Sequence, residues 1–112
     1  MRRERKALRF WGDSLAQLQK VRPAVRQEAG YQLDQVQLGR SPRSFKPMPT
    51  VGAGAFEIRV SDEAGMFRVF YVAKLADAVY VLHCFEKKTQ KTDKRDIDIG
   101  RARYVELKEV GR

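Results

Sequence analysis

The most informative part of the sequence consists of two adjoining stretches, VYVLHCF at residues 79–85 and EKKTQKT at residues 86–92. The first is apolar enough to form a buried strand, so packing fixes the position of its end. The second is rich in lysine, and the cations continue with Lys94 and Arg95 at the start of a predicted helix. A rigid strand that delivers several cations to one place is suited to binding the phosphates of a nucleic acid.

The composition limits the class of protein. The 112 residues allow one domain with a modest core, and a hydrophobic content of 43% argues against disorder. The 23 Lys and Arg residues against 14 Asp and Glu give a formal charge of +9, and the pI is about 10.1. This excess favours a nucleic acid, an acidic protein or an anionic membrane as partner.

The membrane is the weakest of these partners. The longest apolar runs fall short of the roughly 20 residues that span a bilayer, and the basic N-terminus lacks the features of a secretory signal. We therefore expect a cytoplasmic protein without a membrane partner. The chain has one cysteine, Cys84, and one histidine, His83, so we expect neither a disulfide nor a protein-only zinc site, and no small-molecule cofactor.

The N-terminal part predicts a strand and two helices. Alternating residues at 7–11 favour a first strand. Ser14 and Gln17 have the spacing of a capping box, which predicts a short helix. Pro23 interrupts that helix and favours a second one that runs to about Leu38 and lies antiparallel to the first. The apolar stripe of the second helix consists of Val25, Ala29, Leu33 and Val36.

The remaining chain predicts a meander and a closing helix. Prolines and glycines at 39–54 predict a loop in which any strand is short. Alternation at 56–61 and a second run at 66–74 predict a hairpin, and a turn near Asp77 leads to the strand at 79–85. Helical spacing is found at Ile97, Gly100, Tyr104 and Leu107. We therefore predict an α+β fold, with a mostly antiparallel sheet of about four strands, two N-terminal helices and one C-terminal helix.

Charged side chains of the predicted hairpin form a candidate site. Arg59 lies two residues from Glu57 and opposite Arg68, so we expect all three on one exposed face of the sheet. RNA cleavage through the ribose 2′-hydroxyl needs a base, cations for the phosphate and an acid for the departing 5′-oxygen. Glu57 is the candidate base, and the two arginines are candidate clamps. The alternative is a cross-strand ladder of ion pairs on a solvated face, which contributes little stability.

The lysine-rich segment is the second candidate site. Lys94 and Arg95 in a first helical turn oppose the helix dipole, which favours a role in phosphate binding over plain solvation. His83 lies inside an apolar strand, where a packed neutral histidine is the expected arrangement. Cys84 points to the other face and is expected to be a small core residue.

Three motifs in this order resemble the RelE/HigB-type toxins, and specifically their phage-derived HigB-like branch. They are FKPM at 45–48 followed by Gly52, Gly54 and FEIR at 56–59, then FRVFY at 67–71, then HCFEKKTQKT at 83–92. The resemblance implies that residues 1–112 form a single RelE/HigB-like domain. It also implies ribosome-dependent cleavage of mRNA, an endoribonuclease activity, and neutralisation by a cognate helix-turn-helix antitoxin.

The resemblance also assigns residues. By position, the catalytic candidates are Arg59 and Arg68 at the scissile phosphate, with Glu57, Lys87 and Lys88. The RNA-binding candidates are Lys46, Lys91, Lys94 and Arg95. Several family members supply a His or Tyr near the C-terminus as general acid, and this chain has neither between Glu86 and Arg103. Lys87, Lys88 and His83 are therefore the candidate acids. The alternative function is a non-catalytic RNA-binding or phage-derived interaction protein with the same fold.

Overall fold

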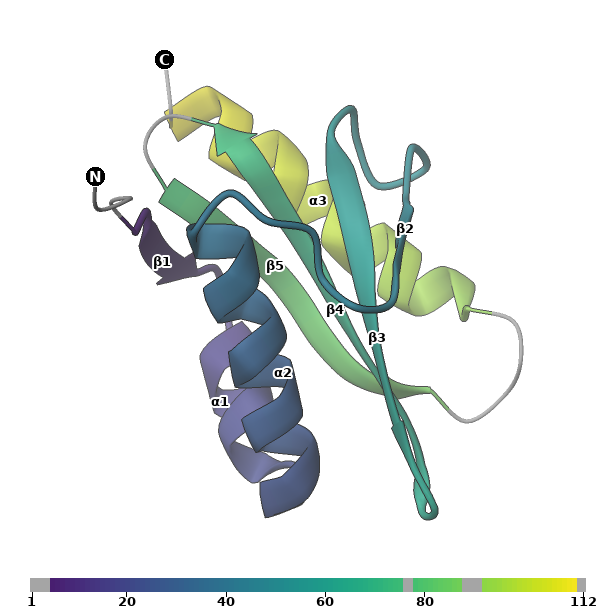
Figure 1. Cartoon of the computed structure of the whole chain (residues 1–112). Coiled ribbons are helices and arrows are strands. Elements are labelled where there is room, and N and C mark those ends of the chain that lie inside the picture. Colours follow the sequence, from purple (N-terminus) through teal and green to yellow (C-terminus); the bar gives the residue numbers. More distant parts are fainter. Residues whose placement is uncertain (1–4, 76–77, 88–91, 111–112) are drawn as a thin grey trace.

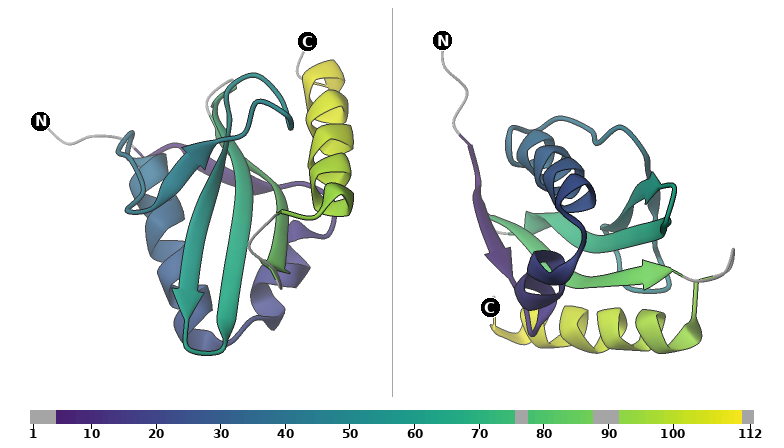
Figure 2. Two further views of the ribbon diagram at one scale, coloured as in Figure 1. Left: turned by 90° about the vertical axis from the view of Figure 1, so that its right-hand side faces the viewer. Right: turned by 90° about the horizontal axis from the view of Figure 1, so that it is seen from below.

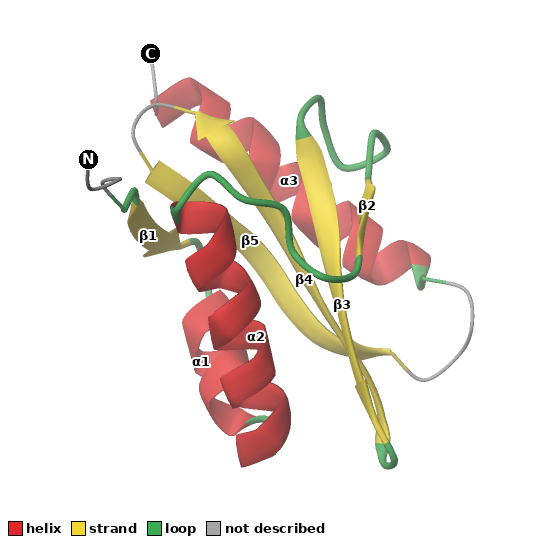
Figure 3. Cartoon of the chain, viewed as in Figure 1, coloured by secondary structure: helices red, strands yellow, loops and turns green. Residues whose placement is uncertain are grey.

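The computed structural model describes residues 5–75, 78–87 and 92–110. Figure 3 distinguishes its helices from its strands. In chain order the elements are β1 (Ala7–Phe10), α1 (Ser14–Lys20), α2 (Pro23–Gln37), β2 (Phe45–Pro47), β3 (Ala55–Asp62), β4 (Gly65–Leu75), β5 (Ala78–Lys87) and α3 (Lys94–Val110). The predicted order of strand, two helices, meander and helix is confirmed.

The strands form one sheet in the order β1-β5-β4-β3-β2 (Figure 1). β1 pairs with β5 in parallel, and the other neighbours are antiparallel. The α+β class and the mostly antiparallel sheet are therefore confirmed. The sheet has five strands rather than about four, because the short β2 forms inside the predicted loop. Pro47 fits there because β2 is an edge strand, where a missing N–H donor is tolerated.

Two layers of helix cover the sheet. α2 lies on one face and α3 on the opposite face, as the view from below in Figure 2 shows. The predicted stripe of α2 is confirmed, since its members Val25, Ala29, Leu33 and Val36 are all buried. They pack with Ile58 and Val69 of the sheet in one apolar cluster. This cluster fixes α2 on the sheet and leaves the opposite face of β3 to other contacts.

The second apolar cluster seats α3. Gly100 and Leu107 are buried, and Ile97 and Tyr104 pack against the same cluster in part, so the predicted stripe is confirmed. Gly100 allows a close approach of helix to sheet: a Cβ atom there would lie 2.7 Å from a ring carbon of Phe70. This close packing holds α3 on the sheet, where Asp96 near the start of the helix contacts His83 of β5.

The capping box expected at α1 is wrong. The N-cap residue is Asp13, and its carboxylate accepts hydrogen bonds from the side chains of Gln17 (3.1 Å) and Arg103 (2.8 Å). Ser14 is buried, and its hydroxyl donates to the carbonyl of Val81 (3.3 Å). The serine is thus used for a tertiary contact with β5 instead of a local cap.

Candidate functional site

Glu57 lies at the centre of the candidate site. In the register of the sheet it pairs with Lys46 of β2 on one side and with Phe70 of β4 on the other. Arg59 pairs directly with Arg68. Because side chains alternate between faces along a strand, Glu57 and Arg59 share a face, and Arg68 joins them from the neighbouring strand. The predicted grouping of these three residues is present.

The expected exposure of that face is wrong. Glu57 is 0% exposed and Arg68 is 5% exposed, whereas the side chain of Arg59 is 39% exposed. The reason is tertiary: the second apolar cluster extends over this face, with Met48 of the connecting loop as a member and Ile97 of α3 packed against it. A solvated ladder of ion pairs, the alternative interpretation, is therefore excluded for Glu57 and Arg68.

The carboxylate of Glu57 contacts three side chains. Its Oε1 atom accepts a hydrogen bond from Nε of Arg59 (3.4 Å) and lies 3.8 Å from Nε of Arg68. Its Oε2 atom accepts a hydrogen bond from the hydroxyl of Thr92 (3.5 Å), just before α3. Sequence reasoning missed Thr92, and its place at the end of the lysine-rich segment was the only signal for it.

Arg68 is held with part of its hydrogen-bonding capacity unused. Its terminal nitrogens donate to the carbonyl of Phe67 (3.2 Å) and to the sulfur of Met66 (3.5 Å). Its buried Nε atom has no hydrogen-bond partner among the described residues. Burial lowers the pKa of Arg68, partly offset by the charge of Glu57. The carboxylate of Glu57, 3.8 Å from this Nε atom, supplies the counter-charge of the buried guanidinium.

The position and burial of Lys87 differ from those predicted. We expected it to follow the last strand with a free side chain, but β5 continues through it and it is only 8% exposed. Burial lowers its pKa, and the positive charge of Arg68 lowers it further. The change arises because β5 pairs with β4 as far as Met66, opposite Lys87. Lys88 and Lys91 lie outside the described residues.

A pocket of about 400 Å³ opens beside this cluster. The residues of its lining that bear on the chemistry are Lys46, Arg59, Lys87 and Thr92. Lys46 is half-buried, so three cations from β2, β3 and β5 face one concavity. We call Lys46, Glu57, Arg59, Arg68 and Lys87 the charged cluster. It places four positive groups around one carboxylate.

The structure places two further RNA-binding candidates, Lys94 and Arg95, outside this pocket. Lys94 is exposed, and its ammonium pairs with Asp98 one turn further along α3 (2.9 Å). The backbone N–H of Arg95 donates to the carboxylate of Asp93 (2.9 Å), which serves the start of the helix. Local carboxylates therefore offset the unfavourable position of these cations in the first turn. Their role in RNA binding stays a prediction.

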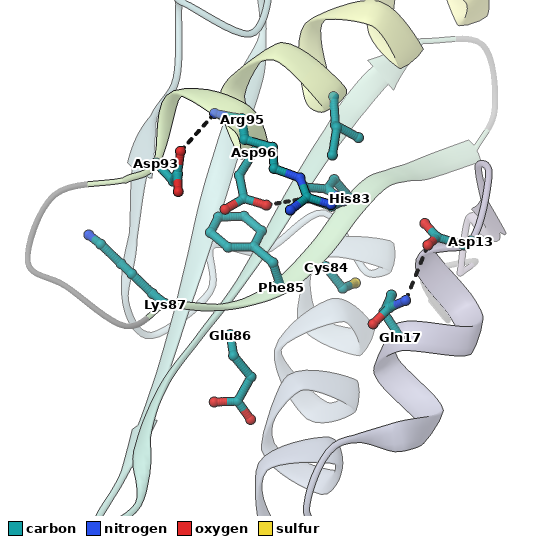
Figure 4. Close-up of a pocket in the computed structure, with 11 residues that line it drawn as sticks. Asp13, Gln17, His83, Cys84, Phe85, Glu86, Lys87, Asp93, Arg95 and Asp96 are labelled. Carbon is teal, nitrogen blue, oxygen red and sulfur yellow. Dashed lines mark hydrogen bonds and ion pairs between the residues drawn. The ribbon is translucent and has the colours of Figure 1, made fainter.

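His83 is packed, as expected, but with a partner that sequence reasoning missed. Its Nε2 atom lies 2.8 Å from the carboxylate of Asp96 on α3, and its ring stacks on Phe85 (Figure 4). Burial lowers the pKa of His83, and Asp96 opposes this effect. These residues line a second pocket of about 510 Å³, which also includes Arg95 and Lys87. Lys87 is thus common to both pockets.

Comparison with known proteins identifies the family. The family model described as phage-derived protein Gp49-like (DUF891) matches residues 16–105. The chain belongs to this family. The match includes every described member of the charged cluster as well as Thr92. The resemblance to the phage-derived branch of the RelE/HigB-type toxins is confirmed at this level.

A solved structure supports the fold of this Gp49-like protein. A chain of the toxin–antitoxin complex RelBE2 from Mycobacterium tuberculosis is 24% identical, with a TM-score of 0.51. The match covers 77% of the present chain and 95% of the other. The fold is therefore RelE-like. No curated protein matches the sequence.

Two further findings concern the described residues. Their helices are too short or too polar to cross a membrane. They contain no group of three or more His, Cys, Asp or Glu side chains able to hold a metal ion.

Proposed function

We propose that this Gp49-like protein is the toxin of a toxin–antitoxin system and cleaves mRNA on the ribosome, in the cytoplasm. The observation that carries the proposal is the charged cluster, in which four cations surround one buried carboxylate beside a pocket. Such an excess of positive charge at a partly buried site is suited to binding a phosphodiester, whose negative charge increases in the transition state of cleavage.

Cleavage would proceed through the ribose 2′-hydroxyl. The hydroxyl loses its proton to a base, its oxygen bonds to phosphorus, and the 5′-oxygen leaves with a proton from an acid. The products are a 2′,3′-cyclic phosphate and a free 5′-hydroxyl. Arg59 is exposed enough to contact the phosphate directly, and Arg68 adds a buried positive charge behind it, beside Glu57. Both groups stabilise the crowded anionic phosphorus.

Of the candidate acids that the structure describes, Lys87 and His83, the geometry favours Lys87. Its side chain lines the same pocket as Arg59, and its lowered pKa brings it closer to the range in which an ammonium group gives up a proton readily. His83 lines the neighbouring pocket and is engaged by Asp96. Glu57 is the carboxylate of the cluster, but it is fully buried and both of its oxygens have partners. The base assignment for Glu57 stays a prediction.

The ribosome and an antitoxin are the proposed partners. The formal charge of +9 favours the phosphates of rRNA, and an mRNA held by the ribosome would reach the pocket in a fixed orientation. The RelBE2 structure is that of a toxin–antitoxin complex, which supports a cognate antitoxin here. The resemblance to the HigB-like branch implies a helix-turn-helix protein.

The second candidate function is a non-catalytic RNA-binding or interaction protein. The observation that favours it is the sequence between Glu86 and Arg103, which contains no His or Tyr to serve as acid. Both functions would use the same charged cluster to bind phosphate. They differ in whether the bound RNA is cut.

Cleavage on programmed ribosomes separates the two functions. We expect the wild-type protein to cut a bound mRNA and to arrest growth when it is expressed without an antitoxin. Arg59→Ala should lower the single-turnover rate by about 10²–10³, as expected for the loss of one transition-state donor. Arg26→Ala is the matched control, because Arg26 is an exposed α2 arginine that contacts the Gln19 carbonyl. Folded wild-type protein that binds ribosomes without cutting mRNA would favour the second function.

A further inference from the structure

A carboxylate at the centre of a phosphate site is costly for phosphate binding. Its charge repels the anion, and the repulsion is strongest in a buried, poorly screened place. Glu57 is 0% exposed and lies among the cations that the proposed function assigns to the substrate. If binding charge were the only requirement, a neutral residue at position 57 would bind phosphate better. Glu57 therefore needs another role.

The two oxygens of Glu57 have different partners. Oε1 faces the Nε atoms of Arg59 (3.4 Å) and Arg68 (3.8 Å). These two arginines are directly paired across β3 and β4, where like charges repel one another. A carboxylate oxygen between them offsets that repulsion and gives both guanidinium groups a common reference point. Removing it would leave Arg68 buried without a counter-charge, which is strongly unfavourable.

The other oxygen is fixed by Thr92. The threonine hydroxyl donates to Oε2 (3.5 Å) from the segment that enters α3. A carboxylate held at both oxygens has little freedom to rotate, so the arginines that it contacts are also fixed. Preorganised donors cost no rearrangement when charge develops on the phosphate. The same contacts make Glu57 poorly placed to accept a proton from a substrate hydroxyl.

We propose that Glu57 is a positioning residue: its carboxylate holds Arg59 and Arg68 in place for an RNA phosphate, and the Thr92 hydroxyl holds the carboxylate. Identifying the phosphate as that of RNA rests on the proposed function. The positioning role rests on the contacts themselves. In this proposal Glu57 contributes to the reaction by positioning the two arginines, and it does not accept the proton of the 2′-hydroxyl.

Binding of an uncleavable RNA tests the proposal without any cleavage. The probe is a short single-stranded RNA with 2′-O-methyl riboses, followed through the NMR signals of the Nε–H groups of Arg59 and Arg68. Positioning predicts that Glu57→Gln weakens binding by about tenfold or more, although the variant is more positive. Asp62→Asn makes the same change in charge at an exposed pair with Arg22 and should bind like the wild type or slightly more tightly. Unchanged or tighter binding by Glu57→Gln would overturn the proposal, as would wild-type arginine signals that do not respond to the RNA.

Thr92 keeps the proposal testable if Glu57→Gln fails to fold. Thr92→Val removes the hydroxyl at a half-buried position and should weaken RNA binding in the same direction by a few-fold. Thr92→Ser keeps the hydroxyl and should restore wild-type binding. If Thr92→Val binds like the wild type, the link between Thr92 and Glu57 has no role in positioning.

The pH dependence of cleavage separates positioning from base catalysis. If Glu57 only positions the arginines, Glu57→Gln and Thr92→Val lower the single-turnover rate and leave the shape of its pH profile unchanged. If Glu57 is the base, Glu57→Gln alone removes the acidic limb, and the positioning proposal is overturned. If the wild-type protein binds the RNA probe but does not cut mRNA on ribosomes, the proposed nuclease activity is wrong. The binding experiment would still test the positioning role of Glu57.

Discussion

The two faces of the sheet show what each layer of this protein contributes. On the face toward α2, strands β3, β4 and β5 present a continuous apolar cluster that includes Ile58, Val69 and Val81. On the face toward α3, the same strands carry an apolar cluster at one place and the charged cluster at another. Alternation along a strand lets one segment serve both purposes. We infer that the first face mainly supplies stability and that the second face, under the proposed function, also supplies the chemistry.

The largest expected effect would fall on the chemical face. Lys87→Met should lower the cleavage rate by about 10²–10⁴, the usual contribution of a general acid. It should not lower the free energy of unfolding, because burial and neighbouring cations already disfavour the charged form of Lys87. Rates on programmed ribosomes and urea denaturation measure the two quantities.

The pH dependence of the cleavage rate tests whether Lys87 acts as an acid. An acid must be protonated to act, so the wild-type rate should fall as pH rises through the folded pKa of Lys87, which lies below its ordinary value of 10.5. Lys87→Arg keeps the charge and should stay slow at every pH, because arginine does not give up its proton. A fast Lys87→Arg variant would show that Lys87 supplies charge alone.

A substitution in the core should have the opposite effect, lowering the stability of the protein without changing its cleavage rate. Leu33 of α2 is fully buried in the apolar cluster, and Leu33→Ala should lower the free energy of unfolding by about 2–5 kcal/mol. The cleavage rate of the molecules that remain folded should be unchanged. A large loss of cleavage rate in folded Leu33→Ala protein would contradict the inference that the α2 face contributes only to stability.

A smaller effect is expected from His83, which connects the sheet to α3. Its folded pKa is lowered from 6.5 chiefly by burial, so the unfolded chain binds the proton more readily. Stability should therefore be complete above about pH 6.5 and fall as pH decreases toward the folded pKa, by at most about 1.4 kcal/mol per pH unit. His83→Gln should flatten this slope in denaturation curves measured between neutral and mildly acidic pH. An unchanged slope would assign the acid sensitivity to other groups.

The smallest effect is expected at the surface. Asp62 pairs with Arg22 in a partly exposed bridge between the β3–β4 hairpin and the start of α2 (2.9 Å). Asp62→Asn should change the free energy of unfolding by about 0–1 kcal/mol, and less at high salt. Equal stability losses for Asp62→Asn and Leu33→Ala would contradict the assignment of stability to the apolar face.

The helices, the strands and the buried faces of the helices were predictable from the sequence. Periodicity located the buried stripe of α2, the inner stripe of α3 and the hairpin that brings Arg59 opposite Arg68. These features depend on residues close together along the chain, so local spacing is sufficient to predict them. The motifs around the same residues also identified the family correctly.

The burial of the charged side chains and their contacts with one another depend on the tertiary structure. Glu57 was predicted to be exposed because its face of the sheet looked free, but the chain around Met48 and α3 covers that face. The partner of Glu57, Thr92, lies just before α3 and far along the chain from β3. The partner of His83, Asp96, lies in the first turn of α3, in a separate element from β5. Spacing along a strand fixes the direction of a side chain, whereas burial and its effect on charge depend on what packs over that strand. In this protein, the direction of Glu57 and Arg68 was predictable from the strand pattern, whereas their burial beneath α3 and the loop around Met48 was not.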